Sequence, residues 1–139
     1  MTLSKKDKMY FNIAKEISKL SDFPRIHVGC VAVYKHRIIS TGVNSLKTRP
    51  LQKKYNRFRY DDDSTPHCMH SEVAALSSLV GNPEIDFKNV SLYIYRENGK
   101  RELAQARPCR GCMQLIMDLG IRDIYYTNEK GFSHERIYN

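Results

Sequence analysis

Two short clusters of residues have the types and spacing of a metal-dependent active site. They are residues 70–72 (HSE) and residues 108–112 (PCRGC). Each cluster stands where a helix is expected to begin, and cysteines three apart in the first turn of a helix point the same way. Cys109 and Cys112 can therefore hold one side of a Zn²⁺ ion, with His70 as the third ligand and one ion expected per chain.

Such a zinc ion is expected to be catalytic rather than structural. Three protein ligands leave the fourth tetrahedral position open for a water molecule, and zinc lowers the pKa of that water toward neutrality. The positive ends of the two helix dipoles favour deprotonated thiolates. Glu72 lies two residues after His70, near enough to reach the water without being a ligand. Its carboxylate can take the water proton and pass it to a ring nitrogen and a leaving amine.

The two clusters together match the H-x-E…P-C-x-x-C signature of zinc nucleobase deaminases. The sequence resembles the cytidine/deoxycytidylate deaminase superfamily from about Val28 to Thr127. This resemblance implies a three-layer α/β/α cytidine deaminase-like fold, and it implies that Asn44 contacts the sugar of the substrate. Ser71 stands where the family has an alanine, a small-for-small change. Ser71 and Pro108 are accordingly expected beside the substrate.

The elements that position these residues follow the order α-β-β-α-β-α-β, with a possible final strand. Helices are expected over residues 4–20, 67–80 and 109–120, and strands over 28–34, 37–41, 90–95, 121–127 and 132–137. Helices that alternate with strands imply a central mixed sheet, here of about five strands, covered on both faces. The length suits one domain, so a single zinc-dependent deaminase domain is expected over residues 1–139.

Two segments depart from the free deoxycytidylate deaminases. In those proteins the third strand leads almost directly into the cysteines, whereas here residues 97–107 intervene, as a hairpin-like excursion. Only 12 residues follow Thr127, too few for a helical crossover to a further parallel strand. A tight hairpin through residues 128–131 is expected instead, and that ending resembles the cytidine deaminase branch.

The polar stretch of residues 45–66 is the best candidate for substrate selection. The first basic and polar side chains after Asn44 are the preferred substrate-binding residues: Lys47, Thr48 and Arg49. Basic side chains can bind a nucleotide phosphate, and the aromatic residues interleaved with them can stack a base. The alternative is a charged loop that only contacts solvent. Arg107 and Arg110 flank the cysteines, where either can reach a phosphate or balance nearby acidic residues.

Composition sets the class of protein and of partner. Hydrophobic residues make up 41% and charged residues 27%, which is typical of a globular protein and excludes wholesale disorder. Neither a signal peptide nor an apolar run of membrane length is recognisable, so a cytoplasmic protein without a membrane partner is expected. Its four cysteines then favour metal binding over disulfides. The net charge of +8 favours phosphorylated or polyanionic ligands, or is merely a solvated basic surface.

The expected function is zinc-dependent hydrolytic deamination of a cytosine-containing nucleoside or nucleotide, of the cytidine/deoxycytidine or dCMP type, with release of ammonia. Two alternatives stay open: a deaminase of single-stranded DNA or RNA, which the charge favours, and a non-catalytic zinc-stabilised binding module, which Glu72 argues against. The expected partner is a small nucleoside or nucleotide, and a homo-oligomer is compatible with the sequence. His67 and Cys68 either bind a second metal or pack at the start of their helix.

Overall fold

The centre of the protein is a five-stranded mixed sheet. The computed structural model describes residues 3–47, 50–58 and 69–137. The strands lie in the order β2-β1-β3-β4-β5, with bounds β1 His27–Tyr34, β2 Arg37–Val43, β3 Val90–Glu97, β4 Asp123–Asn128 and β5 Gly131–Arg136. β1 pairs antiparallel with both β2 and β3, β3 pairs parallel with β4, and β4 pairs antiparallel with β5. The mixed sheet expected from the sequence is confirmed.

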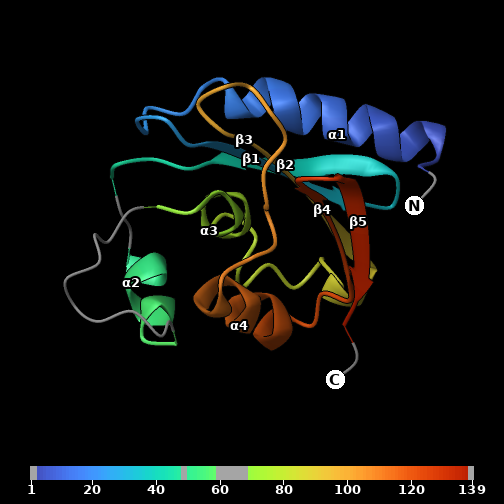
Figure 1. Cartoon of the computed structure of the whole chain (residues 1–139). Coiled ribbons are helices and arrows are strands. Elements are labelled where there is room, and N and C mark those ends of the chain that lie inside the picture. The colour runs from blue at the N-terminus through green and yellow to red at the C-terminus, as the bar shows by residue number, and fades with distance from the viewer. Residues whose placement is uncertain (1–2, 48–49, 59–68, 138–139) are drawn as a thin grey trace.

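Helices cover both faces of this sheet, which gives the three expected layers (Figure 1). One face carries α1 (Lys5–Ser18), and the other carries α3 (Ser71–Leu76) and α4 (Arg110–Leu119), with α2 (Pro50–Asn56) packed beside α4. Each face has its own apolar cluster, so the sheet is buried on both sides. A 3-10 turn, η1 (Phe87–Asn89), leads into β3. No helix within the described ranges has the length and apolar character needed to cross a membrane.

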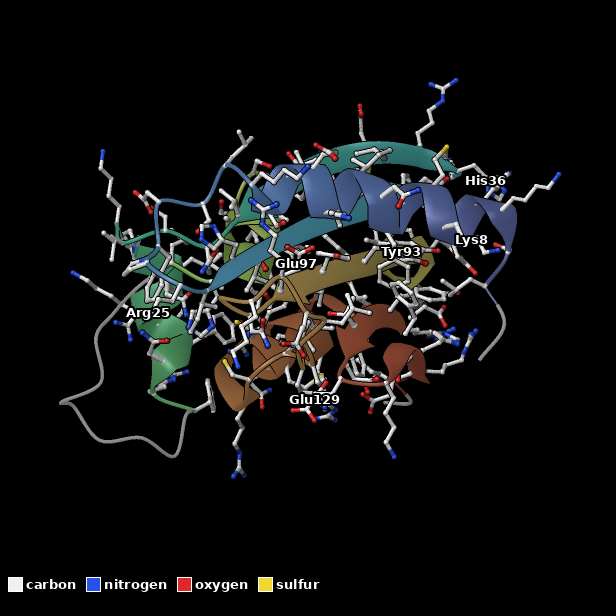
Figure 2. The ribbon with its side chains drawn as sticks, turned by 45° about the horizontal axis from the view of Figure 1, so that its top comes forward. Lys8, Arg25, His36, Tyr93, Glu97 and Glu129 are labelled. Atoms are coloured by element: carbon white, nitrogen blue, oxygen red, sulfur yellow. The ribbon has the colours of Figure 1, made fainter. Side chains whose placement is uncertain are left out.

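On each face of the sheet, a glycine lets a helix pack close against a strand. On the first face, the ring of Tyr93, on β3, lies under α1 (Figure 2), and its centroid is 5.0 Å from that of the Tyr10 ring. Gly29 of β1 faces the backbone of α1, where a Cβ atom would collide with the Ala14 carbonyl oxygen. On the other face, a Cβ atom at Gly42 would collide with backbone atoms of α3. The two glycines therefore set how near both helices pack, and Gly42 fixes the helix that carries Glu72.

Most helix boundaries agree with the sequence, and one helix was missed. The Ser4 side chain caps α1 by accepting from the Asp7 N–H at 3.0 Å. The α3 helix spans Ser71–Leu76 rather than residues 67–80: residues 77–81 form turns, and residues 67 and 68 lie outside the described ranges. No helix was expected in the polar stretch of residues 45–66, yet α2 lies within it, with its proline at the first helical position.

Packing of two aromatic side chains against the core explains why α2 forms and where it lies. The ring of Tyr55 is buried, and its hydroxyl donates to Asp118 of α4 at 2.7 Å. Phe58 packs 5.9 Å from that ring, between centroids. These two aromatic residues join α2 to α4 and the core. Neither is among the residues that line the cavity described below, so the base-stacking role expected for them finds no support here.

Both segments that depart from the deoxycytidylate deaminases fold as the sequence predicts. Glu97, labelled in Figure 2, forms an antiparallel bridge with Leu103, so residues 97–107 turn back on themselves. The Asn98 N–H donates to the Glu102 carbonyl at 2.9 Å across this turn. At the C-terminal end, β5 pairs back on β4 from Gly131, which adopts φ of +136°. The expected closing hairpin is confirmed.

Candidate metal centre and active site

Three potential metal ligands meet where α3 and α4 begin. His70 is the N-cap residue of α3, Cys109 is the N-cap of α4, and Cys112 lies in the first turn of α4. The Nδ1 atom of His70 lies 3.2 Å from the Cys112 Sγ and 3.5 Å from the Cys109 Sγ. All three ligand atoms lie within 4.8 Å of one another. A tetrahedral zinc ion keeps a ligating nitrogen and sulfur about 3.6 Å apart, so this donor set fits zinc.

Electrostatics of the two thiols favour a bound cation. The hydrogen bond with the Cys112 thiol, together with His70, lowers the pKa of Cys109 to about 3. The same hydrogen bond, followed by burial, raises the pKa of Cys112 well above its ordinary value. The pair therefore holds one proton and one negative charge when no cation is present. Binding of a dication to both sulfurs must release that proton, which makes metal affinity depend on pH.

Glu72 is a buried carboxyl group beside these ligands. It is 5% exposed, and the Ser71 hydroxyl donates to its Oε1 at 2.6 Å. Burial raises the pKa of Glu72, while His70 and the Ser71 hydrogen bond oppose that shift. A carboxyl with a raised pKa can accept and return a proton near neutral pH more readily than an exposed one. Ser71 thus contacts the predicted proton carrier directly.

A cavity of about 360 Å³ opens onto this group, a size within the range of small-molecule sites. Its walls include two of the proposed metal ligands, His70 and Cys109, together with Asn44, Ser71 and Glu72. The structure therefore brings together most of the site residues expected from the sequence.

The remaining expected residues are placed elsewhere. Lys47 is exposed and does not line the cavity, and its carbonyl accepts from the Met69 N–H at 3.0 Å. Pro108 is buried next to Cys109 without lining the cavity. Thr48 and Arg49 lie outside the described residues. The substrate contacts expected of these four residues stay predictions.

Asn44 shapes one wall of the cavity. Its amide oxygen accepts from the Val28 N–H at 2.9 Å, and its amide nitrogen donates to the Ile26 carbonyl at 2.9 Å. The side chain is 7% exposed, and Ile26 and Val28 line the same cavity. One amide hydrogen stays available for a ligand, because the amide group has two donors. Asn44 can therefore hold the backbone of this cavity wall in place and still contact a substrate.

Gln52 is a buried polar residue that sequence reasoning missed. This α2 side chain is fully buried, and its Oε1 accepts from the backbone N–H of His70 at 2.9 Å. Its amide nitrogen donates to the Asn56 side chain at 2.8 Å. The bond satisfies the backbone of a proposed metal ligand at a helix start, where N–H groups have no partner within the helix. The only feature of the sequence that could have indicated a helix around Gln52 is the proline that begins α2.

Two arginines complete the cavity wall. Arg107 was expected either to reach a phosphate or to balance acidic residues; it lines the cavity and forms two hydrogen bonds with Glu135, at 2.7 and 3.1 Å. Arg96, which the sequence did not single out, lines the same cavity and donates from Nη1 to the Gln105 carbonyl at 3.0 Å. Arg110 is exposed on α4. The cavity thus combines a potential metal centre, a buried carboxyl group and basic side chains.

The fold and this donor set define a class of zinc-binding deaminase-like proteins. Residues 4–128 match the family model for the cytidine and deoxycytidylate deaminase zinc-binding region, and the chain belongs to this family. A probable deoxycytidylate deaminase of Caenorhabditis elegans is 24% identical over 129 residues, which cover 91% of this chain. The chain spans 59% of the length of that relative.

Solved structures share the fold. A dCMP deaminase of the cyanophage S-TIM5 superposes with a TM-score of 0.63 at 23% identity, over 91% of this chain and 86% of that one. A cytidine deaminase of Burkholderia pseudomallei gives a TM-score of 0.62 at 16% identity, over 96% of this chain and 93% of that one. A cytidine deaminase-like α/β fold is therefore established, and the family supplies zinc as the cofactor.

Proposed function

We propose that this chain catalyses the zinc-dependent hydrolytic deamination of a cytosine nucleoside or nucleotide, with release of ammonia. The observation that carries the proposal is the buried Glu72 carboxyl, which shares a cavity wall with His70 and Cys109. A purely structural metal site has no use for such a carboxyl group beside its ligands. Family membership supports the reaction class, and the C. elegans relative and the S-TIM5 enzyme support cytosine as the base.

The chain's own residues account for the proton transfers. A zinc ion held by His70, Cys109 and Cys112 would lower the pKa of a water ligand and so supply hydroxide near neutral pH. The Glu72 carboxylate accepts one proton from the attacking water and gives it to N3 of the ring as the C4–O bond forms. It then moves the remaining water proton to the amine on C4. The C4–N bond breaks, ammonia leaves, and C4 keeps the oxygen as a carbonyl.

Two neighbours prepare the site for this chemistry. The Ser71 hydroxyl donates to Oε1 of Glu72 and so orients the carboxyl group. Asn44 holds the cavity wall formed by Ile26 and Val28, and offers its remaining amide hydrogen to the sugar of the substrate. Together these contacts keep the reacting base and the carboxyl group in a fixed relation, which lowers the entropic part of the barrier.

The test is ammonia release by purified protein from cytidine, deoxycytidine and their 5′-monophosphates, before and after removal of metal by a chelator. We expect turnover of at least one of these compounds, its loss with the metal, and its recovery when zinc is added back. Adenosine and guanine serve as controls for the base. Absence of ammonia from every cytosine compound, with zinc present, would contradict the proposal.

A further inference from the structure

A second cavity lies at the end of the sheet opposite the candidate active site. Its volume is about 590 Å³, and the two cavities share no lining residue. Along β1, Val28 lines the first cavity and Val33 the second, which separates them by about 16 Å of extended strand. The first turns of α1, the β1–β2 turn and parts of β3 and β4 form its walls. Figure 2 shows His36 and Tyr93, both lining residues, at the end of α1 where that helix begins.

Three basic side chains gather at this second cavity: Lys6, Lys35 and His36. The Lys6 Nζ lies 3.4 Å from Nδ1 of His36, and the Lys35 Nζ lies 5.2 Å from the ring centroid of Tyr34. Within the described residues none of the three forms an ion pair with a carboxylate. When Nδ1 accepts from Lys6, the imidazole carries its hydrogen on Nε2, which is then a donor for a ligand. An anion is the partner that these groups lack.

Asp7 lines the same cavity without neutralising these cations. Its Oδ1 accepts from the Tyr93 hydroxyl at 2.6 Å, and its Oδ2 accepts from the Ser4 N–H at 3.3 Å as part of the capping box of α1. Both carboxylate oxygens thus serve the packing and the start of this helix. Two ammonium groups face this single carboxylate at the cavity, so an excess of positive charge stays there.

The β1–β2 turn presents two of these basic residues at a cost in backbone conformation. Lys35 has φ of +52° and His36 has φ of +64°, in the left-handed region that such two-residue turns usually fill with asparagine and glycine. The His36 carbonyl accepts from the Tyr10 hydroxyl at 3.1 Å, which ties the turn to α1. Backbone strain of this kind persists where the surrounding structure enforces it, and binding sites are a common place for it.

The tyrosine rings at the cavity offer hydroxyl groups rather than open ring faces. One face of the Tyr125 ring stacks on Tyr93 at 4.4 Å, and the other stacks on His134 at 4.3 Å, between centroids. The ring of Tyr93 also lies 5.0 Å from that of Tyr10. Because these faces are already covered, stacking of a nucleobase is disfavoured here. A ligand held by charge and hydrogen bonds suits the cavity better.

We propose that this second cavity binds the phosphate group of a small non-aromatic ligand, of the sugar phosphate class, between Lys6, Lys35 and His36. A phosphate monoester carries about −1.5 to −2 charges at neutral pH, which balances the excess positive charge. Ammonium and imidazole N–H groups donate charge-assisted hydrogen bonds to its oxygens. The cavity is in the size range of small-molecule sites. Further polar side chains of its walls can bond the hydroxyls of the ligand: Ser4, Asn89 and Ser91. This inference is independent of the proposed deamination.

The test is a calorimetric titration of the zinc-loaded full chain with fructose 1,6-bisphosphate, with fructose as the uncharged control. We expect the bisphosphate to bind, its affinity to fall as sodium chloride is raised, and fructose not to bind. Lys35→Gln and Lys6→Gln, both at exposed positions, should each weaken binding about 10- to 100-fold, the effect of losing a hydrogen bond between charged groups. Lys130→Gln, exposed in the turn between β4 and β5, is the matched control and should bind as the wild type.

Amide chemical shifts locate the bound ligand. The bisphosphate should shift the amide resonances of residues 33–36 and leave those of Asn44 and His70, at the first cavity, unchanged. Absence of binding to the wild type, shifts confined to the first cavity, or the same affinity in Lys35→Gln, Lys6→Gln and the wild type would each overturn the inference. Tighter binding of a single-stranded oligonucleotide than of the bisphosphate, weakened by the same two variants, would replace the small ligand with a polynucleotide. None of these readouts uses ammonia release, so the proposed deamination stands or falls separately.

Discussion

Gln52→Ala removes the acceptor that holds the backbone of His70. In the wild type, the His70 N–H donates to the Gln52 Oε1 at 2.9 Å, and the Gln52 side chain is fully buried. The variant loses this hydrogen bond to a buried backbone donor, which costs about 1–3 kcal/mol. Loss of a residue that orients a metal ligand typically lowers metal affinity by about 10- to 100-fold. We therefore expect zinc affinity to fall by that factor.

The assay is a competition titration of zinc between the protein and a chromophoric chelator, with thermal unfolding of the metal-free and zinc-loaded forms alongside. Lys53→Ala is the matched control, because this side chain is exposed on the same helix, and its zinc affinity should equal that of the wild type. A Gln52→Ala variant that loses stability equally in both forms, with unchanged zinc affinity, would refute the coupling and leave Gln52 as a purely structural residue.

Three further predictions concern the ligand set, the packing of α3 and the ion pair of Arg107 with Glu135. Cys112→Ala should abolish zinc binding, measured by metal analysis after dialysis; full zinc content would contradict the ligand set. Gly42→Ala should lower the melting temperature and the activity together, because a Cβ there collides with the backbone of α3; wild-type values for both would contradict that packing. Arg107 lowers the pKa of Glu135 from 4.5, so this carboxylate stabilises the fold above that pH, and the stabilisation is lost as the pH falls below it. Denaturant titrations should show Glu135→Gln less stable than the wild type near neutral pH and similar to it well below 4.5; a gap independent of pH would count against the ion pair.

The cysteine pair was predictable from the sequence because its geometry is local, and His70 because its cluster and the cysteine cluster together match one known motif. Two cysteines three apart at a helix start must point the same way, and a histidine at a second helix start completes the set. The closing hairpin was predictable from the short turn of residues 128–131, which stands between two segments with the composition of strands. These features depend on spacing along the chain, which a sequence displays directly.

Features that depend on contacts between distant segments were not predictable. Gln52 reaches His70 across 18 positions, and an isolated glutamine in a basic stretch gives no periodic signal of burial. Arg96 reads as an ordinary arginine at a strand end until the excursion folds back over it. Lys47 follows Asn44 closely in sequence, yet the bridge between Ser45 and Met69 directs the chain so that Lys47 lies exposed outside the cavity. Closeness in sequence did not imply closeness to the cavity.

The central claim is that Glu72 carries protons beside a zinc centre, and one paired measurement tests it most directly. Zinc content and ammonia release are determined on the same preparations of the wild type, Glu72→Gln and Glu84→Gln, the last an exposed control. We predict one zinc ion per chain in all three proteins, with ammonia release abolished only in Glu72→Gln. Unchanged ammonia release by zinc-loaded Glu72→Gln would contradict the claim.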